Sequence, residues 1–491
     1  MFTANAPGSG AVTPRRSVTV WLIPMLWTHC LGLWGLSRQN SVWRDEAATW
    51  QVARRSTAET VHLLENVDVV HGCYYLLMHG LFTCFGPGTT TLRLPSVLAM
   101  GVAAACVAVI GRRLAGSGAG LAGGLAFGLL PAVQFHLQEG RPYALVTAGA
   151  GIATLLLVTV VQGRARTVHW AGYGSTVLVC GLLNWLSLLI LPAHLVTLVL
   201  TRAGRGVWIR WAIASAVAVA GVAPLVLFSR SQAAQVSWIP PLTWHMMIGP
   251  AVLLLIGGAG AVLDRPRAGR PSVAAVGLPL LAVPQLGLLG ASLVQPLFLD
   301  RYILFSMLGL ALLIGTAAGS AVRAARPRLP EVSRWLLPAM VAVATVALLP
   351  QSLAKRSPES RVDDVLAIAS DVRRLKKRTG GAVLFVPAAR RDTASVSPGA
   401  FTGLRDIALA RSPEKSGTLK GVEAAPDRIR EAMLAQRRIL LVTDAPAVAT
   451  PVTAERDRVK VSVLRQHFTP VADEQVRGRR VTVYERLVPA R

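Results

Sequence analysis

Residues 92–113 read LRLPSVLAMGVAAACVAVIGRR, an apolar run that ends at a pair of arginines. A helix that crosses a lipid bilayer needs about 20 mainly apolar residues. Runs of this kind recur along the first 350 residues, and we predict about eleven membrane spans from them. The predicted spans are residues 17–36, 92–110, 118–136, 143–161, 169–185, 186–201, 211–228, 246–263, 273–293, 303–321 and 335–350.

The composition divides the chain in two. Hydrophobic residues make up 53% of the sequence and charged residues only 15%, whereas a soluble domain carries about 25% charged residues. Residues 1–350 contain nine acidic residues and no lysine, while the remainder holds sixteen acidic residues and all six lysines. We therefore predict a membrane module over 1–350 and a water-soluble domain over 351–491.

The soluble part alternates helical and strand patterns. Helices are predicted at 361–377 and 426–436, and short apolar strands at 382–386, 439–443 and 480–484. This alternation is typical of an α/β domain. The formal net charge of +26 does not indicate nucleic-acid binding, because in the membrane module the arginines fall in short loops between spans.

The loop arginines predict the orientation of the bundle. One set of loops carries arginine clusters, such as Arg112–Arg113, whereas the short loops of the other set carry the single residues Arg141, Arg230 and Arg301. Positively charged loops stay in the cytoplasm. A multi-pass protein of the plasma membrane is expected, with a cytoplasmic N-terminus and, after an odd number of spans, an extracytoplasmic soluble domain.

Seven of the nine acidic residues in the membrane module map to the predicted outer face. Charges near a bilayer are costly and are usually kept for function or pairing, so chemistry is expected on that face. The first outer loop, 37–91, is long enough to be structured, and its stretch 71–82 predicts a helix in the membrane interface. The seven acids are Asp45, Glu46, Glu59, Glu65, Asp68, Glu139 and Asp300.

The first candidate motif is Trp43-Arg44-Asp45-Glu46, just beyond the first span. A carboxylate at this position can take a proton from an incoming hydroxyl, as general-base catalysis requires. The alternative is structural: Asp45 or Glu46 caps the following helix or pairs with Arg44.

The second motif, Gln138-Glu139-Gly140-Arg141-Pro142-Tyr143, lies between the third and fourth spans. Glu139 can orient an acceptor, and the planar guanidinium of Arg141 matches phosphate oxygens. An ion pair between Glu139 and Arg141 that fixes the loop is the alternative.

The third motif, Asp300-Arg301-Tyr302, places another lone arginine at the outer end of a span, where it could bind phosphate or anchor the helix beside Tyr302. His71 could contact a phosphate or a metal ion, or be a solvated interfacial histidine. Together, acids and lone bases on one face suit group transfer from a membrane-embedded phosphate donor.

These motifs resemble the GT-C glycosyltransferases, and among them the bacterial family-39-like enzymes of protein mannosyltransferase type. As an ordered set they are specific, and they cover about the first 310 residues. The matching pieces are Trp43-Arg-Asp-Glu46-Ala-Ala-Thr-Trp50, Asp68 to His79, Leu92-Arg93-Leu94-Pro95-Ser96, Gln138 to Ala144 and Arg301-Tyr302.

The resemblance implies a GT-C fold and an inverting hexosyltransferase that moves a sugar, commonly mannose, from a polyprenyl-phosphate donor to a protein or glycolipid acceptor. It implies that Asp45 is the base, with Glu46 and Glu139 as further catalytic acids. Donor-phosphate contacts are expected from Arg141, Arg301, Tyr302 and His71. The family usually has alanine where Leu137 and Gly140 stand here.

No resident metal site is predicted, although metal dependence differs among relatives, so Mg²⁺ or Mn²⁺ stays an open cofactor. Two other classes stay open as well. One is a transporter or flippase, which the lack of a clear internal repeat disfavours. The other is a relative that transfers aminoarabinose or arabinose to a glycolipid.

Overall fold

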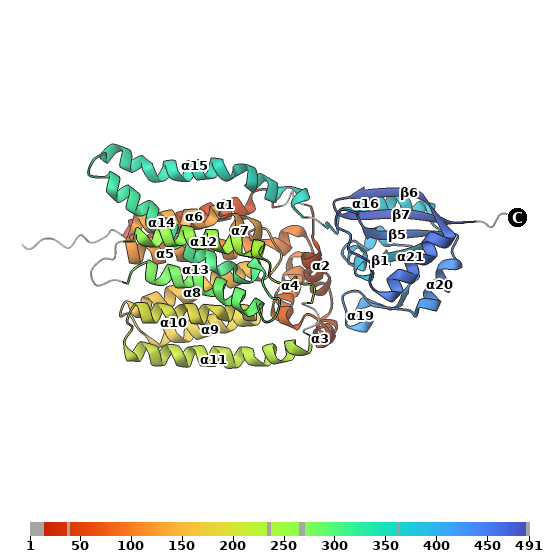
Figure 1. Ribbon diagram of the computed structural model, residues 1–491, viewed down its shortest axis with the longest axis horizontal. Helices are drawn as coiled ribbons and strands as arrows, with labels where there is room; N and C mark the ends of the chain where they lie inside the picture. Colours follow the sequence, from red (N-terminus) through yellow and green to blue (C-terminus); the bar gives the residue numbers. More distant parts are fainter. Residues whose placement is uncertain (1–13, 37–39, 233–236, 265–270, 362, 488–491) are drawn as a thin grey trace, which may run out of the picture.

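The computed structural model describes residues 14–36, 40–232, 237–264, 271–361 and 363–487 (Figure 1). Its first part is a bundle of long apolar helices, and its last part is a sheet flanked by helices. The structure thus confirms the predicted class, a polytopic helical membrane protein with a C-terminal α/β domain.

Every predicted span coincides with a helix of the bundle. Seven helices in the described ranges are individually long and apolar enough to cross a membrane, so the total of eleven stays a prediction. The bundle helices are α1 (Pro14–Leu33), α5 (Thr89–Ala115), α6 (Ser117–Leu129) with α7 (Pro131–His136), α8 (Tyr143–Val161), α9 (Thr167–Leu183), η2 (Trp185–Leu189) with α10 (Ile190–Leu200), α11 (Arg205–Ser229), α12 (Trp244–Val262), α13 (Ala274–Ser292), η4 (Asp300–Ser306) with α14 (Met307–Ala325), and α15 (Pro330–Arg356).

Small residues bring α5, α6 and α14 into close contact. A Cβ atom added to Gly111 of α5 would meet the Cα of Gly120 at 2.9 Å, and one added to Gly315 of α14 would meet the Cα of Gly123 at 2.5 Å. Membrane helices associate through such small residues, because lipid supplies no hydrophobic force between them. These three helices form the tightly packed centre of the bundle.

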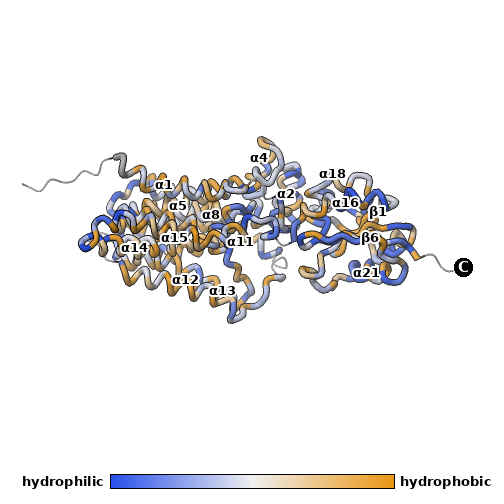
Figure 2. Tube along the Cα trace, turned by 90° about the horizontal axis from the view of Figure 1, so that it is seen from above, coloured by the Kyte–Doolittle hydropathy of each residue, from blue (hydrophilic) through white to orange (hydrophobic). Residues whose placement is uncertain are grey.

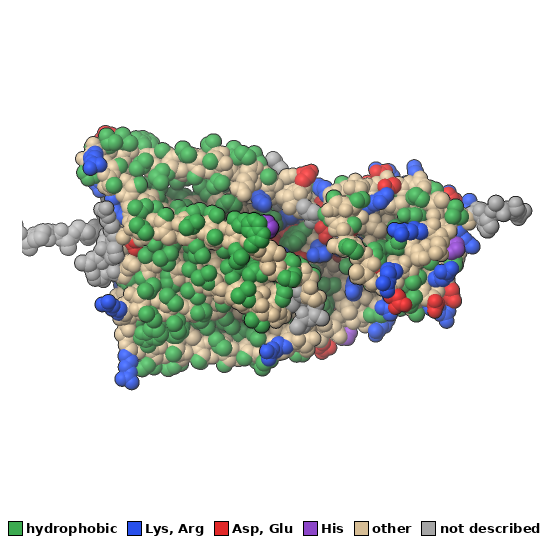
Figure 3. Space-filling view, in the orientation of Figure 1, with side chains coloured by type: hydrophobic (Ala, Val, Ile, Leu, Met, Phe, Trp, Pro, Cys, Tyr) green, Lys and Arg blue, Asp and Glu red, His purple; other side chains and the backbone are tan. Residues whose placement is uncertain are grey.

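Other helices face outward. In α11, α12 and α15, only 22%, 17% and 6% of the most apolar stretch of the helix is buried inside the protein. The exposed side chains on them are large and hydrophobic, for example Val217, Leu255 and Val343. Figure 3 shows hydrophobic side chains covering this face of the bundle, whereas charged side chains gather on the soluble domain and at the opposite end. This surface suits contact with lipid.

The first loop folds into a helical layer between the bundle and the soluble domain (Figures 1 and 2). It contains α2 (Arg44–Ala53), α3 (Thr57–Asn66), η1 (Val69–His71) and α4 (Gly72–Phe85). The predicted helix at 71–82 corresponds to α4, which buries Tyr74 and Tyr75 and exposes Leu76 and Phe85. Its location in the membrane interface stays a prediction.

The soluble domain is built on a five-stranded sheet in the order β2-β1-β5-β7-β6. Strand β1 is parallel to β2 and β5, whereas β7 is antiparallel to β5 and β6. A hairpin-like pair, β3 (Leu409–Arg411) and β4 (Val422–Glu423), lies apart. The sheet strands are β1 (Ala382–Val386), β2 (Arg405–Asp406), β5 (Arg438–Asp444), β6 (Phe468–Val476) and β7 (Arg479–Arg486).

The helices of the soluble domain agree only in part with those predicted from the sequence. The helix predicted at 426–436 is α20 (Pro426–Leu434), and α21 (Glu455–His467) and strand β6 were not predicted. The helix predicted over 361–377 is wrong at its start, since only α16 (Ala369–Leu375) and a 3₁₀ turn at Lys376–Arg378 form. Residues 364 and 365 instead bind Val42 of the first loop. The N–H of Val365 donates to the carbonyl of Val42 at 2.7 Å, and the N–H of Val42 donates to Asp364 Oδ1 at 3.0 Å.

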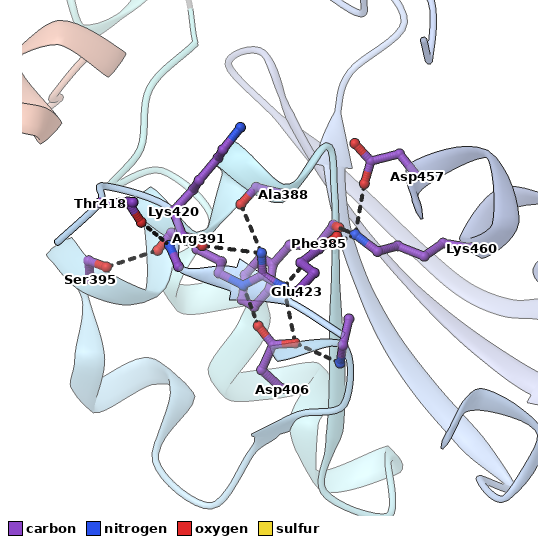
Figure 4. A network of polar contacts seen from close by, with 12 residues as sticks. Phe385, Ala388, Arg391, Ser395, Asp406, Thr418, Lys420, Glu423, Asp457 and Lys460 are labelled. Carbon is purple, nitrogen blue, oxygen red and sulfur yellow. Dashed lines mark hydrogen bonds and ion pairs between the residues drawn. The ribbon is translucent and has the colours of Figure 1, made fainter. Parts of the chain in front are cut away.

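A buried polar network fixes the segment that follows β1 (Figure 4). Arg391 donates to Asp406 and, at 2.7 Å, to Glu423, which also accepts from Lys460 at 2.6 Å. Lys460 further bonds Asp457 at 2.7 Å. Because all these charges are paired, the network holds its segment rigidly. That segment continues into α17 (Asp392–Val396), which packs against α2.

Candidate functional site

Asp45 lies in the first turn of α2 and points toward the start of η4. Its Oδ2 is 3.2 Å from Nη1 of Arg301, and these side chains are only 18% and 14% exposed. The predicted alternative, a pair between Asp45 and Arg44, does not form in the structure. An acid and a base separated by more than 250 residues in the sequence thus meet at one point.

Aromatic rings surround the Arg301 guanidinium. Its Cζ lies 5.7 Å from the ring centre of Trp43, 5.9 Å from that of Tyr143, 5.7 Å from that of Trp238 and 5.8 Å from that of Tyr302. Aromatic faces attract a cation without neutralising it. The rings therefore hold Arg301 in place, and Asp45 is the acidic side chain that pairs with its charge.

Arg141 occupies the other side of Asp45. Its Nη2 is 2.8 Å from Nε2 of His71, and its Nη1 donates to the backbone carbonyl of Asp45 at 3.3 Å. Burial, followed by the charges of Arg141 and Arg301, holds the pKa of His71 well below its usual value. His71 is therefore neutral and accepts the hydrogen bond that orients Arg141.

These groups line one cavity of about 550 Å³ between the bundle and the soluble domain, which we call the central cavity. Five of the seven predicted site residues lie on its wall: Asp45, His71, Arg141, Arg301 and Tyr302. The soluble domain contributes Ala389 and Asp392, which follow β1, together with Thr418, Leu419 and Lys420. The carboxyl end of a parallel strand faces the cavity, as is common for ligand sites in α/β domains.

Glu46 lies away from this cavity. Its side chain is fully buried and accepts from Arg93 at 2.6 and 2.8 Å and from the backbone N–H of Gly140 at 2.8 Å. Arg93 also donates to the carbonyl of Ser41 at 2.6 Å. The carboxylate thus ties α2 to α5 and to the loop before α8, and we propose a structural role for it in place of the predicted catalytic one.

Glu139 is also buried, and it pairs with His136 rather than with Arg141. Burial alone would raise the pKa of Glu139, but the adjacent His136 lowers it to about 2. Ser96 Oγ donates to the Glu139 backbone carbonyl at 2.5 Å. The residue is absent from the wall of the central cavity, so we propose that it positions the loop carrying Arg141.

Several site residues were not identified from the sequence. Arg93, which pairs with Glu46 behind the site, was named only within the Leu92–Ser96 motif and given no role, although it is a lone charge in an apolar run. Trp238 and Lys420 had none, since they lie in loops distant from the outer-face motifs and reach the cavity only through the tertiary fold.

No group of three His, Cys, Asp or Glu side chains within the described ranges is placed to hold a metal ion. The carboxylate of Asp45 instead faces a guanidinium. These residues do not fit a divalent cation at Asp45.

Two further cavities open in the apolar part of the molecule. One, of about 410 Å³, shares His71 and Tyr302 with the central cavity and continues past Leu227 and Leu297. The second, of about 680 Å³, lies among α7, α12, α13 and α14 and is lined mainly by aliphatic residues. Both have walls suited to hydrocarbon.

Comparisons with known proteins extend the resemblance seen in the sequence. No family model matches the chain, and no curated protein matches it. Among solved structures, the apo form of ArnT from Cupriavidus metallidurans superposes with a TM-score of 0.61 at 13% identity, covering 95% of this chain and 98% of that one. ArnT bound to undecaprenyl phosphate gives 0.50 at 13% identity, with the same coverage.

A mycobacterial arabinofuranosyltransferase, AftD (mutant R1389S), gives a TM-score of 0.50 at 17% identity over 97% of this chain, which spans 42% of AftD. At such low identity these likenesses concern the fold. The chain has the fold of the GT-C superfamily glycosyltransferases, an integral membrane fold.

Proposed function

We propose that this protein is an inverting glycosyltransferase that moves a sugar, mannose in the first instance, from a polyprenyl-phosphate donor to an acceptor hydroxyl on the extracytoplasmic face of the membrane. The observation that carries the proposal is the pairing of Asp45 with Arg301 at 3.2 Å, beside Arg141, on the wall of one cavity. We propose residues 1–350 as the membrane module and 351–491 as the extracytoplasmic domain.

The proposed reaction is a single displacement. The donor phosphate binds Arg301 and Arg141, which offer charged donors to its oxygens. Arg301 thereby releases the Asp45 carboxylate, which accepts the proton of the acceptor hydroxyl while the acceptor oxygen attacks the anomeric carbon. The bond from the anomeric carbon to the phosphate oxygen breaks on the opposite face, and the arginines stabilise the departing polyprenyl phosphate.

The apolar cavity next to the site supports a lipid-linked donor. It joins the central cavity at His71 and Tyr302, so a phosphate at the arginines could extend its hydrocarbon chain between η2 and α11. ArnT, which shares the fold, has been seen with undecaprenyl phosphate bound. The arginine clusters in loops such as Arg112–Arg113 support a cytoplasmic N-terminus.

Replacement of Asp45 by asparagine tests the assignment. Asp45→Asn keeps the size of the side chain but removes the base, so sugar transfer should fall by about 10²- to 10⁴-fold. Transfer of radiolabelled mannose from polyprenyl-phospho-mannose is measured in membranes with equal protein levels. The exposed Asp427→Asn on α20 is the control, and near-normal transfer by Asp45→Asn would refute the proposal.

A second candidate is transfer of an arabinose-type sugar to a glycolipid. The cavity of about 680 Å³ inside the bundle favours it, because a second hydrocarbon chain could lie there. Analysis of the products formed with mannose and arabinose donors separates this candidate from the first.

A further inference from the structure

A polar cleft adjoins the central cavity, and none of the residues in the proposed reaction lines it. Its volume is about 400 Å³, and it lies between the loop helices α2 and α3 and the soluble domain. Gln51 of α2 lines both this cleft and the central cavity, so the two spaces meet at that side chain.

One face of α2 runs from the proposed base to the cleft. Asp45, Ala48 and Gln51 all line the central cavity, as their three-residue spacing on a helix allows. Six residues of α-helix rise about 9 Å. A short chain of sugar units whose terminal hydroxyl reaches Asp45 would therefore extend along α2 into the cleft.

Most residues that line the cleft are polar or charged, the others are Ala394, Pro398 and Pro413, and none is aromatic or branched aliphatic. The first-loop side contributes Arg54, Arg55 and Glu59, and the soluble domain contributes Ser395 and Glu414. Such walls differ from those of the two cavities in the bundle, which are mainly apolar. Lipid chains would bind in the bundle cavities, and the cleft would bind a polar molecule.

Two side chains that line the cleft carry unpaired buried atoms. Gln51 is 7% exposed and Arg55 is 5% exposed. Among the described residues, neither Gln51 Oε1 nor Arg55 Nη1 has a hydrogen-bond partner, although Arg55 Nη2 donates to the carbonyl of Thr418 at 2.8 Å. Buried polar atoms without a partner are costly. An acceptor and a donor on the wall of one cleft match hydroxyl groups, which can both donate and accept.

We infer that this cleft is the acceptor subsite and that the acceptor is a water-soluble glycan, held by its hydroxyls at Gln51 and Arg55 while its terminal sugar lies at Asp45. The inference rests on the proposed function and adds the substrate class of the same site. It implies that the acceptor enters between the first-loop helices and the soluble domain, not from the bilayer.

Acceptor chain length tests the inference in the full-length protein. With polyprenyl-phospho-mannose as donor, methyl mannoside and its di-, tri- and tetrasaccharide homologues serve as acceptors. The KM should fall as the chain grows long enough to reach the cleft. Gln51→Ala and Arg55→Ala remove the proposed hydrogen bonds, and Ser395→Trp blocks the path. Each should raise the KM for the tetrasaccharide about fivefold more than that for the monosaccharide.

Arg430→Ala, on the far helix α20, is the matched control and should change neither KM. A KM independent of chain length, or variants that affect all acceptors equally, would overturn the inference and leave the proposed function standing. Transfer only to a serine-containing peptide or to a glycolipid in vesicles would overturn it as well. If the donor is not consumed in the presence of any of these acceptors, both the inference and the proposed function are refuted.

Discussion

At the scale of single residues, Asp45 and Glu46 show how neighbouring acids can have opposite surroundings. Successive residues of a helix point about 100° apart. Asp45 therefore faces the cavity and Arg301, while Glu46 points into the packing and binds Arg93. The motif predicted both acids as catalytic, because nothing in the local sequence reveals which side of α2 is covered.

Replacing Glu46 should affect stability before chemistry. Glu46→Gln leaves the buried Arg93 guanidinium without its counter-charge, and breaking a buried pair costs about 3–5 kcal/mol. We expect a lower thermal midpoint in detergent, partly restored in the Glu46→Leu/Arg93→Met double variant. A Glu46→Gln protein with normal stability and abolished transfer would instead place Glu46 in catalysis.

His71 should make stability depend on pH. Its pKa is held well below the usual value by burial and by two arginines, so the folded protein keeps it neutral while the unfolded chain protonates it near pH 6.5. The unfolded state then binds more protons as the pH falls below about 6.5, and folding stability decreases. His71→Gln removes this contribution.

The thermal midpoints of wild type and His71→Gln, measured from pH 8 to pH 5, check this expectation. The amount by which the thermal midpoint of the wild type exceeds that of His71→Gln should decrease as the pH falls below about 6.5. A difference in midpoint that stays constant across the range would contradict a neutral, partly buried His71.

At the scale of elements, apolar length located the helices well. The span predicted at 143–161 coincides with α8, because this helix, although mostly buried inside the bundle, carries a continuous apolar run. Strand β6 escaped detection, since it is an edge strand whose side chains are largely exposed and mix polar with apolar types. The wrong helix start at residue 361 has a different cause, a tertiary bond to Val42 that no local pattern records.

The close contact of α5 with α6 provides a test of the packing. A Cβ on Gly120 would meet the backbone of α5, including the Arg112 nitrogen at 2.6 Å, whereas a Cβ on Gly118 of the same helix meets nothing within 4 Å. Gly120→Ala should destabilise the protein by about 1–3 kcal/mol. Gly118→Ala should not, and equal thermal midpoints of the two variants in detergent would argue against this helix contact.

At the scale of the whole molecule, the soluble domain is tied to the bundle beside the site. The buried Arg361 donates to the carbonyl of Gln138 at 2.6 Å and lies 4.5 Å from the ring centre of Phe135. Gln138 adjoins Glu139, and Val42, which binds Val365, adjoins Trp43. The sequence separated the two parts of the chain but could not show this coupling, because its contacts join residues more than 200 positions apart.

Removal of the Arg361 contact should loosen the two parts together. Arg361→Ala loses a charged hydrogen bond worth about 1.5–3 kcal/mol, so we expect faster proteolysis near residues 357–368 and slower sugar transfer. The exposed Arg373→Ala on α16 is the control. Unchanged proteolysis and transfer in Arg361→Ala would show that the docking does not depend on this residue.

Helix α15 leads from the bundle into the soluble domain. It contains 27 residues, and its apolar stretch from Trp335 to Leu353 corresponds to about 28 Å of helix, close to the roughly 30 Å of a hydrocarbon core. Little of it is packed against the bundle, and Arg356 at its end binds the carbonyls of Leu31 and Trp34 at 2.5 and 3.2 Å. A membrane thinner than this stretch would tilt the helix, so we expect membrane thickness to change the position of the soluble domain that follows α15.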